Sequence, residues 1–119
     1  MKTYALAYSN VSSFSSLSCK HIENYAFAAC KQLKSLNITK VVDVGINAFY
    51  NNRLNGALEL PECSSIGEFA FSANENYQSG IKSIYIPKCE IVGRYAFCNT
   101  SYMSMNYTSV VAKNCLSIG

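Results

Sequence analysis

Residues 84–97 read Ile84-Tyr85-Ile86-Pro87-Lys88-Cys89-Glu90-Ile91-Val92-Gly93-Arg94-Tyr95-Ala96-Phe97. The closing Ala-Phe pair also ends at Phe27, Phe49 and Phe71, so the successive Phe residues stand 22, 22 and 26 positions apart. The eighth residue before each Phe is Cys19, Val41, Cys63 or Cys89, and the fifth is Ile22, Val44, Ile66 or Val92. Several positions that repeat in one phase indicate a stack of similar structural units.

A second pattern lies between the Phe of one unit and the Cys or Val of the next. Apolar residues alternate with other residues over 35–38, 57–60, 83–86 and 109–112. Alternation of period two predicts short strands with one apolar face, and Pro61 and Pro87 end two of them because Pro cannot donate to a ladder. The Ala-Phe segments are too short for a regular helix, so we expect one helical or 3₁₀ turn that carries Phe inward.

These units resemble a known repeat family. The block Ile-Gly-x-x-Ala-Phe, together with the preceding strand and Pro-x-Cys, is similar to the BspA-like (Treponema pallidum type) leucine-rich repeats of bacterial and protist surface proteins, over essentially the whole chain. The resemblance and the patterns imply a leucine-rich-repeat solenoid, mainly β, with a parallel sheet on one face and short helical or 3₁₀ turns on the other, in an α/β horseshoe-like arrangement. The family also implies a cell-surface or secreted setting.

The chain is expected to form a single domain. Its 119 residues are too few for two cores, and they hold about four to five units over residues 1–119. Cys115 and Ile118 keep the offset of a unit start, and no polar cap is visible at either end. We therefore interpret the sequence as a fragment of a longer array.

Composition and charge argue against several partners. The Lys and Arg residues are scattered and the formal net charge is only +3, whereas nucleic-acid binding normally needs a basic patch. No apolar run approaches the roughly 18 residues of a membrane helix. We therefore predict no nucleic-acid partner and no membrane span.

The cysteines are expected to serve packing. Cys19, Cys63, Cys89 and Cys115 share a phase with Val41, which indicates a buried column, and parallel Cβ vectors suit disulfides poorly. Cys30 falls outside that phase and is expected to be partly exposed, and Cys98 more so. The six cysteines contain no C-x-x-C, and Cys19 with the single His21 cannot complete a zinc site, so no metal or cofactor is predicted.

No enzyme signature is present. The sequence has no phosphate-binding glycine motif and no G-x-S-x-G, and any Ser/His/Asp arrangement would depend on His21 alone. Carboxylates such as Glu59 and Glu68 fall on different parts of the repeat, as solvated side chains do. We predict that the protein is not an enzyme.

The outward strand positions are the candidate site. These positions form two columns along the stack. One column has small side chains and contains Ser35 and Ser83. The other varies from unit to unit and contains Asn37, Glu59, Tyr85 and Val111. Solenoids bind partners through such an extended face, and Tyr is enriched at binding hot spots. We therefore predict a non-catalytic protein-interaction or adhesion module whose partner, by the resemblance, is a host or matrix protein or another cell. The alternative is a structural building block that self-associates end to end into oligomers or filaments.

Overall fold

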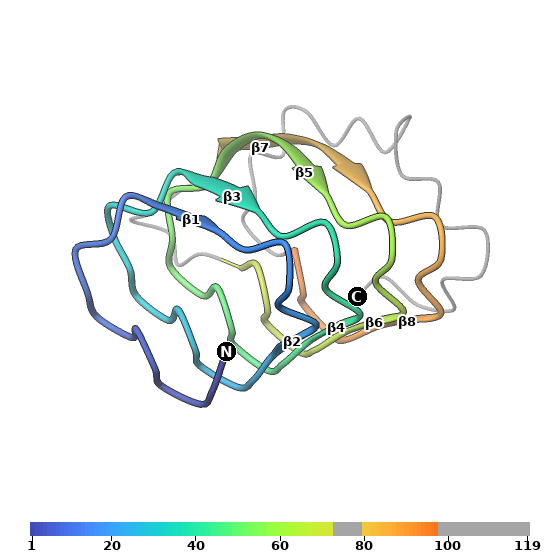
Figure 1. Ribbon diagram of the computed structural model, residues 1–119, viewed down its shortest axis with the longest axis horizontal. Helices are drawn as coiled ribbons and strands as arrows, with labels where there is room; N and C mark the ends of the chain where they lie inside the picture. Colours follow the sequence, from blue (N-terminus) through green and yellow to red (C-terminus); the bar gives the residue numbers. More distant parts are fainter. Residues whose placement is uncertain (73–79, 98–119) are drawn as a thin grey trace.

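The computed structural model describes residues 1–72 and 80–97 of the chain. Within these ranges the chain forms successive coils, each with a strand, a corner, a two-residue strand and a turn (Figure 1). The strands are β1 (Ser13–Ser15), β2 (His21–Ile22), β3 (Ser35–Asn37), β4 (Asp43–Val44), β5 (Asn55–Glu59), β6 (Ser65–Ile66), β7 (Gly80–Tyr85) and β8 (Ile91–Val92). The predictions for Cys98, Val111, Cys115 and the strand at 109–112 lie outside the described residues.

The strands stack in parallel and in the phase of the repeat. One face of the stack carries β1 paired with β3 and β5 paired with β7, and another carries the four-stranded sheet β2-β4-β6-β8. Ser13 pairs with Ser35 and His21 with Asp43, so one repeat of the sequence corresponds to one coil. The prediction of a mainly β solenoid with parallel strands is confirmed.

The Phe residues form a single file through the core. Adjacent ring centroids from Phe27 through Phe49 and Phe71 to Phe97 lie 5.0, 5.1 and 5.5 Å apart, and the rings are parallel within 8°. All four side chains are buried, and Phe14 caps Phe27 at 4.8 Å. Centroids in this range are typical of stacked aromatic pairs, which add attraction beyond the buried area. This file of Phe rings therefore joins each coil to the next.

The prediction of helical or 3₁₀ turns on the second face was wrong: the described residues contain no helix. In the turn at residues 25–29, every second backbone N–H donates a hydrogen bond to the next coil. The N–H groups of Tyr25, Phe27 and Ala29 donate to the carbonyl oxygens of residues 46, 48 and 50. Only the N–H groups of the residues between them, Ala26 and Ala28, donate locally, each to the carbonyl oxygen three residues earlier in the chain. Tyr25 and Ala29 also have positive φ, so the right-handed conformations that a helix needs do not follow one another.

Gly45, Gly67 and Gly93, which hold the same place in three units, allow the coils to approach closely. A Cβ built on Gly67 would lie 2.6 Å from the carbonyl carbon of Gly45 and 2.6 Å from the amide nitrogen of Ile46. A Cβ built on Gly93 would likewise lie 2.6 Å from the carbonyl carbon of Gly67. Backbone thus packs on backbone at this corner, which explains the Ile-Gly step of the repeat.

The cysteine column is confirmed as part of the packing. Cys63 and Cys89 are fully buried in phase with Val41, Cys19 is half-buried, and none of the three forms a disulfide. Each of the three Sγ atoms donates to the carbonyl oxygen two residues further on, at 3.2–3.4 Å. The thiol therefore fills an apolar slot and also satisfies a carbonyl, which Val cannot do.

The prediction that Cys30 is partly exposed was wrong. Its side chain is fully buried, and Sγ donates to the carbonyl oxygen of Leu6 at 2.9 Å. Asn52 occupies the same place one coil later, is 2% exposed, and donates from Nδ2 to the carbonyl oxygen of Phe27 at 2.9 Å. Cys30 and Asn52 can therefore be buried at this position although their side chains are polar, because each donates a hydrogen bond to a backbone carbonyl oxygen of the preceding coil.

Candidate functional site

The outward side chains of the strands form the candidate site. Phe14, Leu36, Leu58 and Ile84 are the inward neighbours in β1, β3, β5 and β7. Alternation therefore turns the residues on either side of them outward. Ser15 pairs with Asn37 and Glu59 with Tyr85, so strand register aligns the predicted column within each of the two sheets.

The predicted residues are accessible to different degrees. Ser35, Asn37 and Glu59 are exposed, and Ser83 is half-buried. Tyr85 is 42% exposed, so much of a large aromatic side chain is accessible to solvent. Five of the six residues therefore share one face, which we call the strand face, and Val111 lies outside the described residues.

A break divides the strand face between β3 and β5. These strands are neighbours along the stack but belong to separate sheets, whereas β5 arches together with β7 (Figure 1). A narrow cleft of about 20 Å³ opens at the break. It is lined by Lys34, Leu36, Ile38, Leu54, Asn55, Ala57, Leu58, Glu59 and Ile81.

The cleft was not predicted, although the sequence holds a signal for it. Gly56 has a φ of 81°, and the register of β5 against β7 shifts between Gly56 and Ala57, opposite the extra residue Lys82. A bulge of this kind bends the strand and increases its twist. The Asn55-Gly56 dipeptide in front of the apolar alternation was therefore the available sign that β5 departs from β3.

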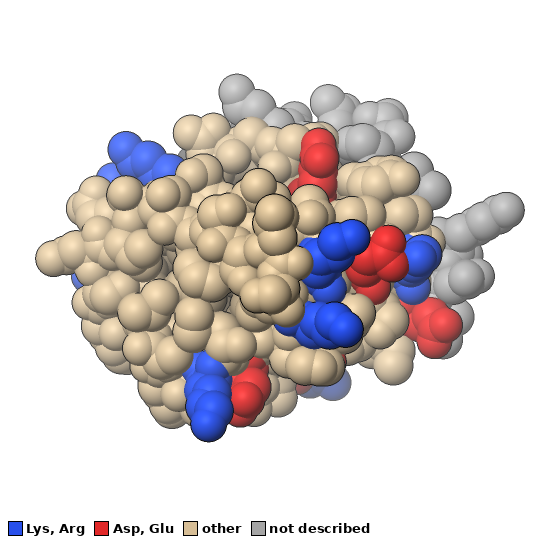
Figure 2. Space-filling view, in the orientation of Figure 1, with Lys and Arg blue, Asp and Glu red and all other residues tan. Residues whose placement is uncertain are grey.

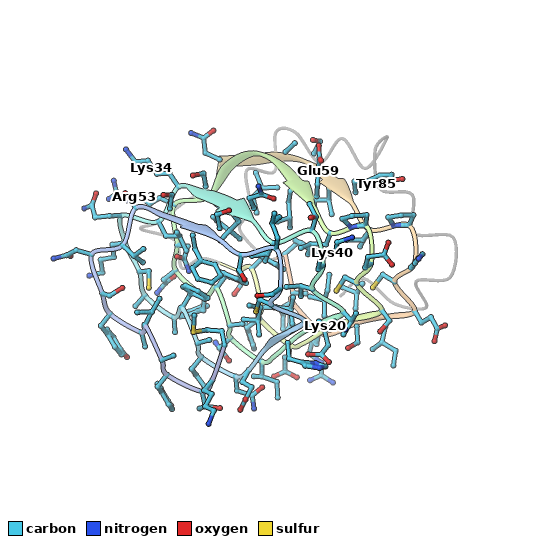
Figure 3. The ribbon with its side chains drawn as sticks, viewed as in Figure 1. Lys20, Lys34, Lys40, Arg53, Glu59 and Tyr85 are labelled. Atoms are coloured by element: carbon cyan, nitrogen blue, oxygen red, sulfur yellow. The ribbon has the colours of Figure 1, made fainter. Side chains whose placement is uncertain are left out.

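Charges of opposite sign lie at the two ends of this face. Lys34 and Arg53 lie where β3 and β5 begin, and Glu59 ends β5 beside Tyr85 (Figure 3). A partner that crosses the break would thus meet basic groups at one side and a carboxylate next to an aromatic ring at the other. Complementary charges of this kind orient a partner more than they increase its affinity.

The described residues do not form a catalytic triad. His21 Nδ1 lies 2.8 Å from Asp43 Oδ2, and Ser65 pairs with Asp43 in the next strand. The carboxylate thus stands between the imidazole and the hydroxyl, whereas nucleophilic catalysis needs the imidazole in the middle. The His21 side chain is 63% exposed and the Asp43 side chain 43% exposed.

Metal ligands do not gather in the part of the chain that the structure describes. Over residues 1–72 and 80–97, no three His, Cys, Asp or Glu side chains are placed to share an ion. The same ranges contain no helix with the length and apolarity needed to cross a membrane.

An ion pair joins two coils at the corner that follows the strand face. Lys88 Nζ donates to Glu62 Oε2 at 2.7 Å. The hydrogen bond and the positive charge of Lys88 lower the pKa of the Glu62 carboxyl, and the charge of Lys40 contributes further. The carboxylate of Glu62 is therefore held ionised and partnered.

We expect Lys88→Gln to raise the pKa of Glu62, because the substitution removes the largest cause of its lowering. Titration of the side-chain carboxyl by NMR measures this pKa directly. Lys40→Gln should raise it by a smaller amount, since Lys40 acts through charge alone. A Glu62 pKa that is the same in Lys88→Gln and the parent protein would contradict the ion pair.

Comparison with protein-family models identifies a repeat family that covers almost the whole chain. The model, described as a BspA-type leucine-rich repeat region of six copies, covers residues 1–117. The chain belongs to this family. BspA-type repeats are generally non-catalytic, they mediate protein–protein interaction, and the proteins that carry them are often surface or secreted proteins. No curated protein and no solved structure matches the chain.

Proposed function

We propose that the protein is an interaction or adhesion module that binds a protein partner through the strand face. The observation that carries this proposal is the column of Asn37, Glu59 and Tyr85, in which strand pairing fixes Asn37 beside Ser15 and Glu59 beside Tyr85 and presents different accessible side chains. Preorganised surfaces lose little conformational entropy on binding. The small Ser35 and Ala57 beside the column leave room for a partner to approach the strands.

The setting we propose follows from the family. Surface or secreted location is common among proteins with these repeats, so the partner is a host or matrix protein or a protein on another cell. Tyr85 would be the anchor, because a half-exposed aromatic ring beside a carboxylate offers both apolar area and a polar handle.

The test compares two tyrosines with similar exposure. Tyr85 on the strand face is 42% exposed, and Tyr95, in the turn that follows β8, is 45% exposed. In biolayer interferometry against purified extracellular-matrix proteins and cell-surface ectodomains, Tyr85→Ala should weaken binding by about thirtyfold, the loss typical of a hot spot of about 2 kcal/mol. Tyr95→Ala should bind as the parent protein does.

Circular dichroism of both variants confirms that each is folded before binding is compared. Equal losses in the two variants, or the absence of binding to every protein tested, would overturn the proposal. End-to-end self-association stays a prediction, and light scattering over a concentration series tests it. A mass that stays at 13.1 kDa at all concentrations would contradict it.

A further inference from the structure

An open hollow lies at the corner that follows the strands, away from the strand face. It has a volume of about 610 Å³ and is lined by Leu17, Ser18, Lys20, Lys40, Val42 and Glu62. These residues come from three successive coils, in the loops between β1 and β2, β3 and β4, and β5 and β6. Ligand pockets commonly have volumes of about 300–1,000 Å³.

Two ammonium groups line this hollow without a partner of their own. Within residues 1–72 and 80–97, neither Lys20 nor Lys40 forms an ion pair, and the nearby carboxylate of Glu62 is engaged by Lys88. Lys20 and Lys40 are labelled near each other in the middle of Figure 3, and Figure 2 shows blue side chains beside a red one in the same part of the view. The hollow thus has a net positive charge.

The backbone around the hollow is held in place. Val42 N–H donates to the carbonyl oxygen of Lys20 at 2.7 Å, and Ser64 donates to the carbonyl oxygen of Val42 from both N–H and Oγ. Cys19 N–H donates to Ser16 Oγ at 3.0 Å, which fixes the loop that carries Leu17. The two lysines therefore project from a fixed backbone, and only their side chains need to be ordered when a ligand binds.

The lining also contains apolar surface. Leu17 is 68% exposed and Val42 is half-buried beside it. A purely polyanionic ligand would leave this apolar surface uncovered and would also approach the carboxylate of Glu62. A peptide in which a carboxylate stands next to an aliphatic side chain matches both the lysines and the apolar lining.

We propose that this hollow is a binding site for an acidic peptide segment of a protein partner. Lys20 and Lys40 receive one or two carboxylates of the segment, and Leu17 and Val42 contact the neighbouring aliphatic side chain. The Lys88–Glu62 ion pair bounds the site on the third coil and limits it to a short run of negative charge. The site shares no lining residue with the predicted column of the strand face, so it adds a second contact to the module.

The probe is an acetylated, fluorescein-labelled peptide of alternating glutamate and leucine, measured by fluorescence anisotropy with the full chain. Lys20→Gln/Lys40→Gln should weaken its binding by about two- to thirtyfold, the range expected for the loss of two exposed charge contacts. Leu17→Ser should weaken it further, although it changes no charge. Raising the salt concentration from about 20 to about 200 mM should weaken binding to the parent protein more than to the double variant.

The matched control is Lys2→Gln/Arg94→Gln, which removes the same charge from exposed positions outside both the hollow and the strand face and should leave binding unchanged. Equal weakening in the control would overturn the site, and so would equal binding of a peptide with glutamine in place of glutamate. Tighter binding of a sulfated oligosaccharide through the same lysines would overturn the assignment to a peptide. Because Tyr85→Ala leaves the hollow intact, loss of the strand-face interaction does not affect this test.

Discussion

Phe49→Ala is expected to destabilise the protein by about 3–5 kcal/mol, the cost of emptying a buried aromatic site. Phe49 is 1% exposed and lies between Phe27 and Phe71, with ring centroids 5.0 and 5.1 Å away. Each coil contacts only its neighbours, so loss of the central ring weakens the coupling between the coils on its two sides. Domains are stabilised by about 5–15 kcal/mol in total, so this single change removes a large share.

Urea unfolding followed by circular dichroism measures this effect. Phe49→Leu keeps most of the volume and should cost less than Phe49→Ala, and Tyr85→Ala at an exposed position should change the unfolding free energy by no more than about 0.5 kcal/mol. If Phe49→Ala unfolds at the same urea concentration as Tyr85→Ala, the aromatic file does not hold the coils together.

Gly67→Ala is expected to cost about 3 kcal/mol, although it adds a single carbon atom. That atom would lie 2.6 Å from backbone atoms of Gly45 and Ile46. Backbone cannot rotate away as a flexible side chain can, so the coils must separate locally. The separation would also strain the hydrogen bond from Gly67 N–H to the carbonyl oxygen of Val44, which is 2.8 Å long.

Gly56→Ala is the matched control, since a Cβ at Gly56 would have no atom within 4 Å. Its φ of 81° still disfavours Ala, so we expect a cost of about 1–2 kcal/mol from backbone conformation alone. Thermal and urea unfolding of the two variants separate the effect of close packing from the effect of φ. A smaller loss for Gly67→Ala than for Gly56→Ala would refute the close contact between coils.

The repeated positions of the sequence predicted the core accurately, because each core residue packs against the equivalent residue of the neighbouring coil. The aromatic file, the column of Cys63, Cys89 and Val41, and the parallel strands all follow from this equivalence. The outward positions of the candidate site also follow, since alternation fixes which side chains leave the core.

The features that sequence did not predict depend on backbone hydrogen bonds. Local pattern favours a helical turn at Tyr25–Ala29, but bonding to the next coil competes with it and prevails. A polar position such as Asn52 is expected at the surface until the carbonyl oxygen that it satisfies is located. The break between β3 and β5 accompanies a register shift of β5 against β7, where Lys82 has no pairing partner in β5, and the alternation of β5 alone does not reveal that shift.

The alternating bonds of the turns give the stack a direction. In each turn, N–H groups such as those of Phe27 and Phe49 face the following coil, and the carbonyls that they meet face back. Removal or duplication of one whole coil would bring the same donors against the same acceptors. Gene rearrangements in steps of one unit can therefore change the length of such a chain while its neighbours stay bonded.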